Sequence, residues 1–159
     1  MHRKPNNRST WSMFPSLHDQ VAQLLQESNL SFAFHNVDEI HCDNEYDTNI
    51  MGRFSCHNPN CASGGWSSKV VPITIRMYSE RRYNARVYHQ RCILCNRLAK
   101  PRLDDSYAER VAYRLKKWSG IDVQNPFSSP HDYNKPPHIS DLCEGCKAGH
   151  CRRGDVGSL

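Results

Sequence analysis

Apolar side chains recur at helical spacing near the N-terminus and again in the second half of the chain. The first run predicts a short amphipathic helix from Ser16, its expected N-cap, to Asn29. The second run predicts a helix from Asp104 or Asp105, either of which can cap it, to about Ser119. Both apolar stripes are more typical of a helix that packs on a core than of a binding surface.

Between these helices the period of the apolar pattern changes to two. Alternation over 71–77 predicts a half-buried strand, and the same pattern over 85–90 predicts a second strand. The polar residues 80–84 predict a turn, so the two segments should form a long hairpin with a basic outer face. Pro72 places the first strand at a sheet edge or a bulge, because proline has no N–H to donate. A short strand over 31–37 and an acidic loop up to Asp47 should precede the hairpin.

The organisation that follows is one α+β domain with short extensions. We expect a flexible basic arm over 1–15, a single domain over 16–152 whose core is 50–152, and a tail over 153–159. Residues 122–137 hold four of the nine prolines, which is typical of a linker or an ordered loop. No apolar run approaches the roughly 20 residues of a membrane helix, so we expect no membrane insertion.

Cysteine is the residue type that changes this picture most. The 159 residues include eight cysteines and nine histidines, and the N-terminus has no signal-peptide core. Extracellular disulfides are therefore a poor expectation, and reduced thiols that bind a metal in the cytoplasm or nucleus are a better one. Zinc is the metal that clusters of thiolates favour.

The first two cysteine pairs flank the predicted hairpin. Cys56 and Cys61 lie before it, and Cys92 and Cys95 lie at its end. Because the two strands return the chain to its starting end, both pairs should meet and supply four thiolates to one zinc ion. This is the arrangement of a zinc ribbon.

The third cluster supplies three thiolates, from Cys143, Cys146 and Cys151, so a second zinc site needs a fourth ligand. We favour His138, whose approach is restricted by two preceding prolines; His150 and Cys42 are the alternatives. The sequence thus predicts two zinc ions per chain, although the way the pairs are shared between them stays open. The expected fold is a zinc-ribbon-like antiparallel sheet with two flanking helices, stabilised by two zinc sites.

Charge is distributed unevenly along the chain. Residues 66–102 contain nine Lys or Arg and one acid, whereas 37–47 contain five acids and no Lys or Arg. We therefore expect separate basic and acidic regions on the molecule. The basic stretch also carries tyrosines that could stack on unpaired bases, so it predicts RNA or other nucleic-acid binding. The expected contacts are the arginines Arg76, Arg81, Arg82, Arg86 and Arg91.

Two other interpretations of the charge pattern stay open. The arginines could form a solvated face that offsets anionic zinc–thiolate centres, and the acidic loop and first helix could bind a protein client. An enzyme is not expected, since the chain has no phosphate loop, metalloprotease helix, hydrolase elbow or deaminase signature.

The order of these motifs resembles one zinc-finger family. The run GRFSC, Trp66, the segment RVYHQRCILC and the ending PHISDLCEGCKAGHC are similar to the three-CxxC zinc fingers of receptor-transporting and zygote arrest proteins, and above all to compact fungal members. The first pair departs from the family in having four intervening residues. The resemblance implies zinc binding without catalysis, and either RNA binding or a chaperone and trafficking role without a membrane anchor.

Overall fold

The computed structural model describes residues 10–123 and 139–151. These residues form a curled, mostly antiparallel sheet and three α-helices, with two short 3₁₀ turns. In chain order the elements are β1 (Trp11–Ser12), η1 (Pro15–Leu17), α1 (His18–Gln26), β2 (Ala33–Phe34), β3 (Asn44–Phe54), β4 (Trp66–Tyr78), β5 (Arg82–Tyr88), β6 (Gln90–Arg91), β7 (Leu98–Ala99), β8 (Pro101–Leu103), α2 (Ser106–Trp118), η2 (Ser140–Leu142) and α3 (Glu144–Lys147).

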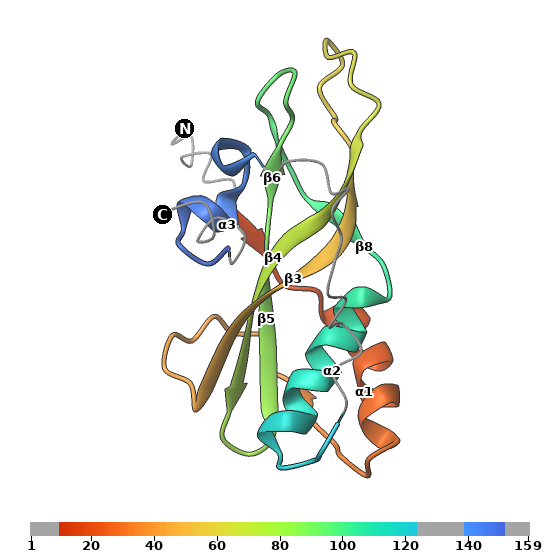
Figure 1. Cartoon of the computed structure of the whole chain (residues 1–159), viewed down its shortest axis with the longest axis vertical. Helices are drawn as coiled ribbons and strands as arrows, with labels where there is room; N and C mark the ends of the chain where they lie inside the picture. The colour runs from red at the N-terminus through yellow and green to blue at the C-terminus, as the bar shows by residue number, and fades with distance from the viewer. Residues whose placement is uncertain (1–9, 124–138, 152–159) are drawn as a thin grey trace, which may run out of the picture.

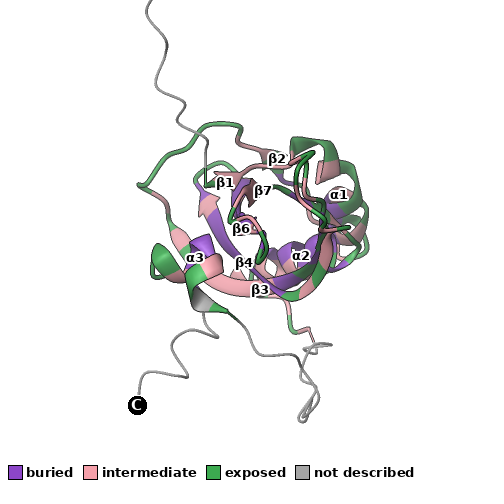
Figure 2. Cartoon of the chain, turned by 90° about the horizontal axis from the view of Figure 1, so that it is seen from above, coloured by how far each residue is buried: buried purple, intermediate pink, exposed green. Residues whose placement is uncertain are grey.

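Two long strands, β3 and β4, dominate the sheet. The strand order is β1-β5-β4-β3-β8, with β2 added in parallel beside β5, and β6 and β7 form a separate two-stranded ribbon. The sheet curls until α1 and α2 close its open side, as the view from above shows (Figure 2). The loop before β4 and the turn between β6 and β7 both project from the same end of the molecule (Figure 1).

The two predicted helices are confirmed, and both pack on one face of the sheet. Val21 and Leu25 of α1 and Val111 and Leu115 of α2 belong to the same buried cluster as Ile73 of β4. Ser16 does not cap α1 as expected, because the chain enters the helix through the 3₁₀ turn η1 and no side-chain cap bond forms. At α2, by contrast, Asp104 Oδ1 accepts a hydrogen bond from the Ser106 amide at 2.9 Å.

The hairpin of β4 and β5 is confirmed, but β4 is buried on both faces rather than on one. Ile73 and Ile75 face the helices, while Thr74, Arg76 and Tyr78 are also buried. The second face is covered by residues 35–43, named here the acidic loop, and by the loop that carries Cys143, Cys146 and Cys151. The polar residues of the alternating pattern in β4 are therefore not exposed to solvent. Their side chains contact other segments of the chain.

Two local expectations need correction. Trp11 and Ser12, placed in the flexible arm, pair with Tyr88 and Val87 of β5. The acidic segment ends earlier than expected, because β3 begins at Asn44. Of the two expectations for Pro72, the bulge is the one that the structure supports: Pro72 lies in a central strand, beside a bulge in the β3–β4 pairing and just beyond the last residue that pairs with β5.

No helix within residues 10–123 and 139–151 is long and apolar enough to cross a membrane.

Candidate metal centre

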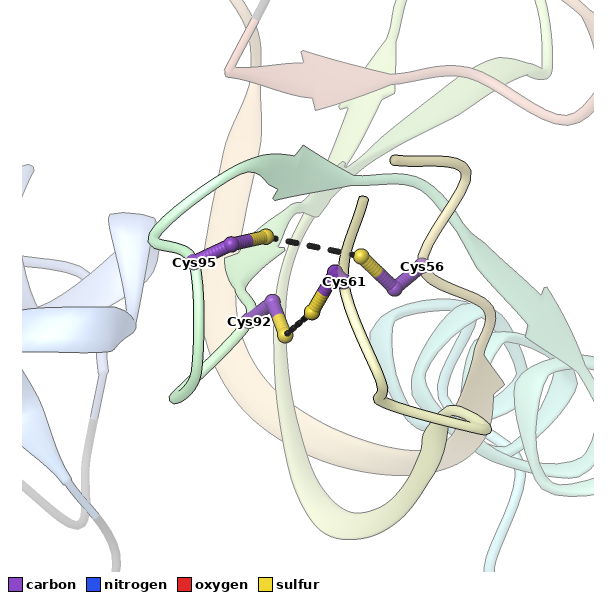
Figure 3. Close-up of side chains that lie close together, drawn as sticks. All are labelled: Cys56, Cys61, Cys92 and Cys95. Carbon is purple, nitrogen blue, oxygen red and sulfur yellow. Dashed lines mark hydrogen bonds between the residues drawn. The ribbon is translucent and has the colours of Figure 1, made fainter. Parts of the chain in front are cut away.

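The first two cysteine pairs meet at one end of the sheet. Cys56 and Cys61 come from the loop between β3 and β4, and Cys92 and Cys95 come from the turn between β6 and β7. All four sulfurs lie within 4.8 Å of one another and point toward a common centre (Figure 3). The arrangement brings together the four residues that the sequence assigned to one site.

The sulfur spacing suits a tetrahedral metal ion. Cys56 Sγ lies 3.5 Å from Cys95 Sγ, and Cys61 Sγ lies 3.8 Å from Cys92 Sγ. A zinc ion with Zn–S bonds near 2.3 Å separates its sulfurs by about 3.8 Å. The donor set and its spacing therefore fit Zn²⁺, and four thiolates leave no coordination position open for water.

The backbone of the second pair is folded to place both sulfurs together. The Asn96 amide donates to the Cys92 carbonyl at 2.7 Å, the Cys92 amide donates to the Arg97 carbonyl at 2.9 Å, and Asn96 has a left-handed φ of 59°. Such a knuckle leaves amides free to donate to the sulfurs. Burial acts to raise the pKa of Cys92, but the amides of Cys95 and Leu94 outweigh it and lower the pKa to about 6.

The thiols of this cluster do not ionise alike. The Ser63 amide acts to lower the pKa of Cys61, but burial and the neighbouring thiols of Cys95 and Cys92 outweigh it and raise the pKa to about 12. Four like charges repel one another at this distance. A divalent cation at the centre removes that conflict, which is a second reason why the cluster suits a metal ion.

Cys143 caps α3 and Cys146 lies within it, so the third cysteine cluster is built on this helix, which lies on the opposite side of the sheet from α1 and α2 (Figure 1). Cys143, Cys146 and Cys151 place their sulfurs within 4.8 Å of one another, and the Cys146 amide approaches Cys143 Sγ at 3.4 Å. A hydrogen bond with Cys151 and burial raise the pKa of Cys143. Three buried or half-buried thiols that converge in this way fit a second zinc ion with one further ligand.

The loop of this second cluster is attached to the sheet at several points. The Glu144 amide donates to the His89 carbonyl at 3.1 Å, and Gln90 forms an isolated bridge with Cys143. Gly145 packs against Pro72 so closely that a Cβ at this position would overlap the proline ring. Arg91 Nε donates to Glu144 Oε1 at 2.7 Å, which links the strand before Cys92 to α3.

Of the three candidates for the fourth ligand, His138 lies outside the described residues. His150 Nδ1 lies 3.0 Å from both carboxylate oxygens of Asp47, and its ring stacks on Tyr88. Neither His150 nor Cys42 belongs to the group formed by the three sulfurs. His150 therefore links the loop of the third cysteine cluster to β3 and β5. That His138 is the fourth zinc ligand stays a prediction.

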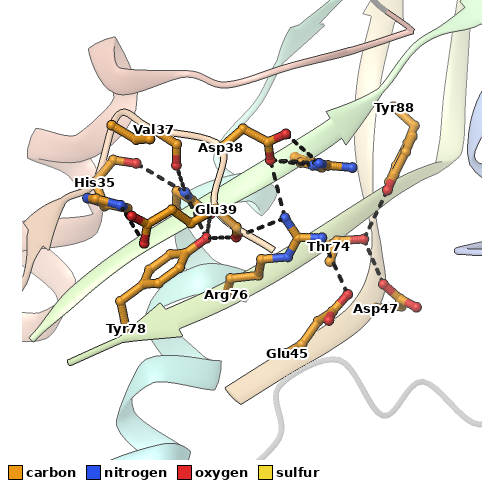
Figure 4. Close-up of polar contacts among 12 residues, drawn as sticks. His35, Val37, Asp38, Glu39, Glu45, Asp47, Thr74, Arg76, Tyr78 and Tyr88 are labelled. Carbon is orange, nitrogen blue, oxygen red and sulfur yellow. Dashed lines mark hydrogen bonds and ion pairs between the residues drawn. The ribbon is translucent and has the colours of Figure 1, made fainter. Parts of the chain in front are cut away.

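The expected separation of basic and acidic regions is wrong for two arginines of the hairpin, Arg76 and Arg86, because the acidic loop covers them. Asp38 accepts hydrogen bonds from Arg76 at 3.3 Å and from Arg86 at 2.6 Å (Figure 4). The Arg76 side chain, only 4% exposed, also lies 3.7 Å from Glu45. The chain thus neutralises Arg76 and Arg86 with its own acids, and the complementary charges of 37–47 and 66–102 were the signal for this pairing.

The other sequence-predicted contacts divide into two groups. Arg91 is paired with Glu144, whereas Arg81 is exposed at the tip of the hairpin and Arg82 hydrogen-bonds to Ser79. The five arginines therefore do not form one surface. The tyrosines of the hairpin, Tyr78, Tyr83 and Tyr88, are buried.

Sequence reasoning missed a pocket that lies between the two cysteine clusters. It has a volume of about 770 Å³ and is bounded by β3, β4, β6, β8 and the η2 turn. Its wall residues are scattered from Met51 to Leu142 along the chain, so no local sequence motif predicts the pocket.

Comparison with known families agrees with the cysteine geometry. A family model of the three-CxxC zinc-ribbon type, described as a zinc-binding domain, matches residues 49–149. This range is more than half of the chain and includes six of the seven clustered cysteines, all except Cys151. Comparison with curated proteins and with solved structures finds no match. The chain belongs to the three-CxxC zinc-ribbon family of zinc-binding domains.

Proposed function

We propose that the chain is a non-enzymatic adaptor, in which two zinc ions hold the fold and the surface beside them binds a protein partner. The four-cysteine cluster supports a structural metal, because a catalytic zinc keeps a position open for water or substrate. His138 would complete the second site with Cys143, Cys146 and Cys151.

The observation that carries the adaptor role is a pair of exposed aliphatic side chains on the turn between Cys92 and Cys95. Ile93 and Leu94 lie between Cys92 and Cys95 and are 68% and 65% exposed. Single exposed apolar residues are ordinary, but adjacent ones on a rigid turn favour a protein interface. Met51 and Ile139 are further exposed apolar side chains, and both line the same pocket as Ile93.

RNA binding is the second candidate, and Arg81 is the observation that favours it. Arg81 is exposed at the hairpin tip, next to Arg82. Arg76, Arg86 and Arg91 would have to leave their acidic partners before they could bind phosphate. Buried tyrosines offer no stacking surface to bases. We therefore rank RNA below a protein partner.

We also propose a reducing location, in the cytoplasm or nucleus. None of the eight cysteines, which all lie within the described residues, forms a disulfide, and seven of them lie in clusters that would bind zinc as thiolates.

Proximity labelling in cells, combined with RNA crosslinking, tests the adaptor role. The comparison uses the parent, the double variant Ile93→Ser with Leu94→Ser, and the double variant Arg81→Glu with Arg82→Glu as the matched control. We expect a reproducible set of labelled proteins that the aliphatic variant loses and the arginine variant keeps, with RNA crosslinking at background.

The opposite pattern contradicts the adaptor role. Specific RNA crosslinks that weaken steeply with salt and vanish in the arginine variant would favour RNA binding, since each phosphate contact releases counterions. Zinc content and melting temperature of both variants must equal those of the parent for either result to count.

A further inference from the structure

The pocket between the two cysteine clusters combines an apolar wall with walls that the zinc sites hold in place. Its apolar lining includes Met51, Trp66, Val70, Ile93, Leu103 and Ile139. Ile93 lies inside the knuckle of Cys92 and Cys95, and Leu142 directly precedes Cys143. Both zinc sites therefore contribute to the shape of this one pocket.

Trp66 forms a fixed part of the wall. Its ring stacks on Phe54 with the centroids 5.0 Å apart, and its Nε1 donates to Gln90 Oε1 at 3.2 Å. Gln90 in turn donates to the Val70 carbonyl at 2.9 Å and bridges to Cys143. A wall held by these contacts needs little reordering when a ligand enters, which favours binding.

The edge of the pocket is basic. Arg53, Lys69 and Arg102 are exposed, and none of them forms an ion pair with an acid among the described residues. Asp104 is the one acid of the lining, and its carboxylate accepts the Ser106 amide at the start of α2. The surface thus differs from the hairpin, where Arg76 and Arg86 both pair with Asp38.

Two of these cations face each other across a strand pair. Arg53 of β3 and Arg102 of β8 are direct partners in the antiparallel register. Like charges in opposite positions destabilise a sheet, so this pair costs stability in the free protein. An anion bound between the two guanidinium groups would remove the repulsion and bind both.

The lining favours a peptide over a nucleic acid as the anion. Unpaired bases bind mainly by stacking on aromatic rings, whereas the apolar lining here is aliphatic except for Trp66, one face of which stacks on Phe54. Aliphatic pockets with a basic edge suit an apolar side chain that has carboxylates beside it.

We infer that this pocket binds an acidic segment of a partner protein, with one or two apolar anchor side chains inside and Asp or Glu side chains paired with Arg53, Lys69 and Arg102. This inference rests on the proposed adaptor function and names its partner's chemistry. The segment would span both zinc sites, so its binding requires both metal ions.

Selection of a random displayed peptide library on the zinc-loaded protein tests the inference. We expect enriched peptides with Leu, Ile, Phe or Met flanked by at least two acids. Their affinity should fall about tenfold or more for Arg102→Glu and for Met51→Glu, and should be unchanged for Arg81→Glu, which alters an arginine outside the pocket. Because Arg102→Glu also relieves the repulsion with Arg53, its melting temperature should equal or exceed that of the parent.

Each other outcome overturns the inference. Enriched peptides that lack acids, or that bind Arg102→Glu as well as the parent, place the contact elsewhere. Absence of enriched peptides while labelled partners still depend on Ile93 and Leu94 would retain the adaptor function and remove the pocket from it. A random 20-nucleotide RNA that binds the parent and loses affinity in the Arg102→Glu variant would remove both proposals, and a dimer held through Met51 would assign the pocket to a second copy.

Discussion

Arg76 shows how one buried charge shapes this surface. It lies near the C-terminal end of β4 with a side chain only 4% exposed, and its charge is balanced by Asp38 and Glu45. Asp38 also binds Arg86 through both carboxylate oxygens at 2.6 Å. A single acid in the acidic loop therefore fixes two arginines of the hairpin.

Replacing Asp38 should expose this dependence. Asp38→Ala leaves the buried Arg76 with Glu45 as its remaining acidic partner, so we expect the free energy of unfolding to fall by about 2 kcal/mol. Urea unfolding of the zinc-loaded protein measures this change in the free energy of unfolding. Glu45→Ala, which removes an exposed carboxylate at 3.7 Å, should cost less than about 1 kcal/mol. Equal losses in the two variants would contradict the central role of Asp38.

Cysteine substitutions separate metal ligands from a bystander. Cys92→Ser removes one of four ligands from the first cluster, and we expect it to lose that zinc ion and to unfold or aggregate. Cys42→Ser is the matched control, since Cys42 lies outside both clusters, and it should keep the zinc content and melting temperature of the parent. Elemental analysis measures the zinc content of both variants, and thermal melting measures their stability. A stable Cys92→Ser protein with full zinc would remove Cys92 from the site.

At the scale of elements, the sequence predicted the pieces that carry a local period. Both helices and the hairpin follow from apolar repeats, and the cysteine pairs meet because β4 and β5 return the chain to one end. The second covered face of β4 could not be predicted in this way. It depends on Asp38 and on Gly145, which contact β4 from distant parts of the chain. Non-local cover of this kind leaves no periodic signal.

The loop that carries the first cysteine pair depends on one glycine. Gly65 has a left-handed φ of 101°, and a Cβ there would collide with the Phe54 carbonyl, whereas a Cβ at Gly64 would meet nothing within 4 Å. We expect Gly65→Ala to lower the free energy of unfolding by about 2 kcal/mol and to speed zinc transfer to a chelator. Gly64→Ala should change neither by a measurable amount. The reverse order of the two variants would show that the loop is not held as described.

For the whole molecule, zinc should be a condition of folding. The cysteine loops join β3, β6 and the C-terminal segment, and the core has no disulfide to take over that role. Structural zinc contributes on the order of 10 kcal/mol to small zinc-dependent folds. We therefore expect complete chelation to abolish the cooperative melting transition, and zinc addition under reducing conditions to restore it. A metal-free protein that melts like the parent would contradict the structural role.

The number of zinc ions per chain tests the central claim most directly, and native mass spectrometry of the purified protein measures it. The two cysteine clusters predict two zinc ions in the parent chain and one in Cys143→Ser, which keeps the four-cysteine cluster. A parent chain that binds one zinc ion, with the same count in Cys143→Ser, would contradict the second site.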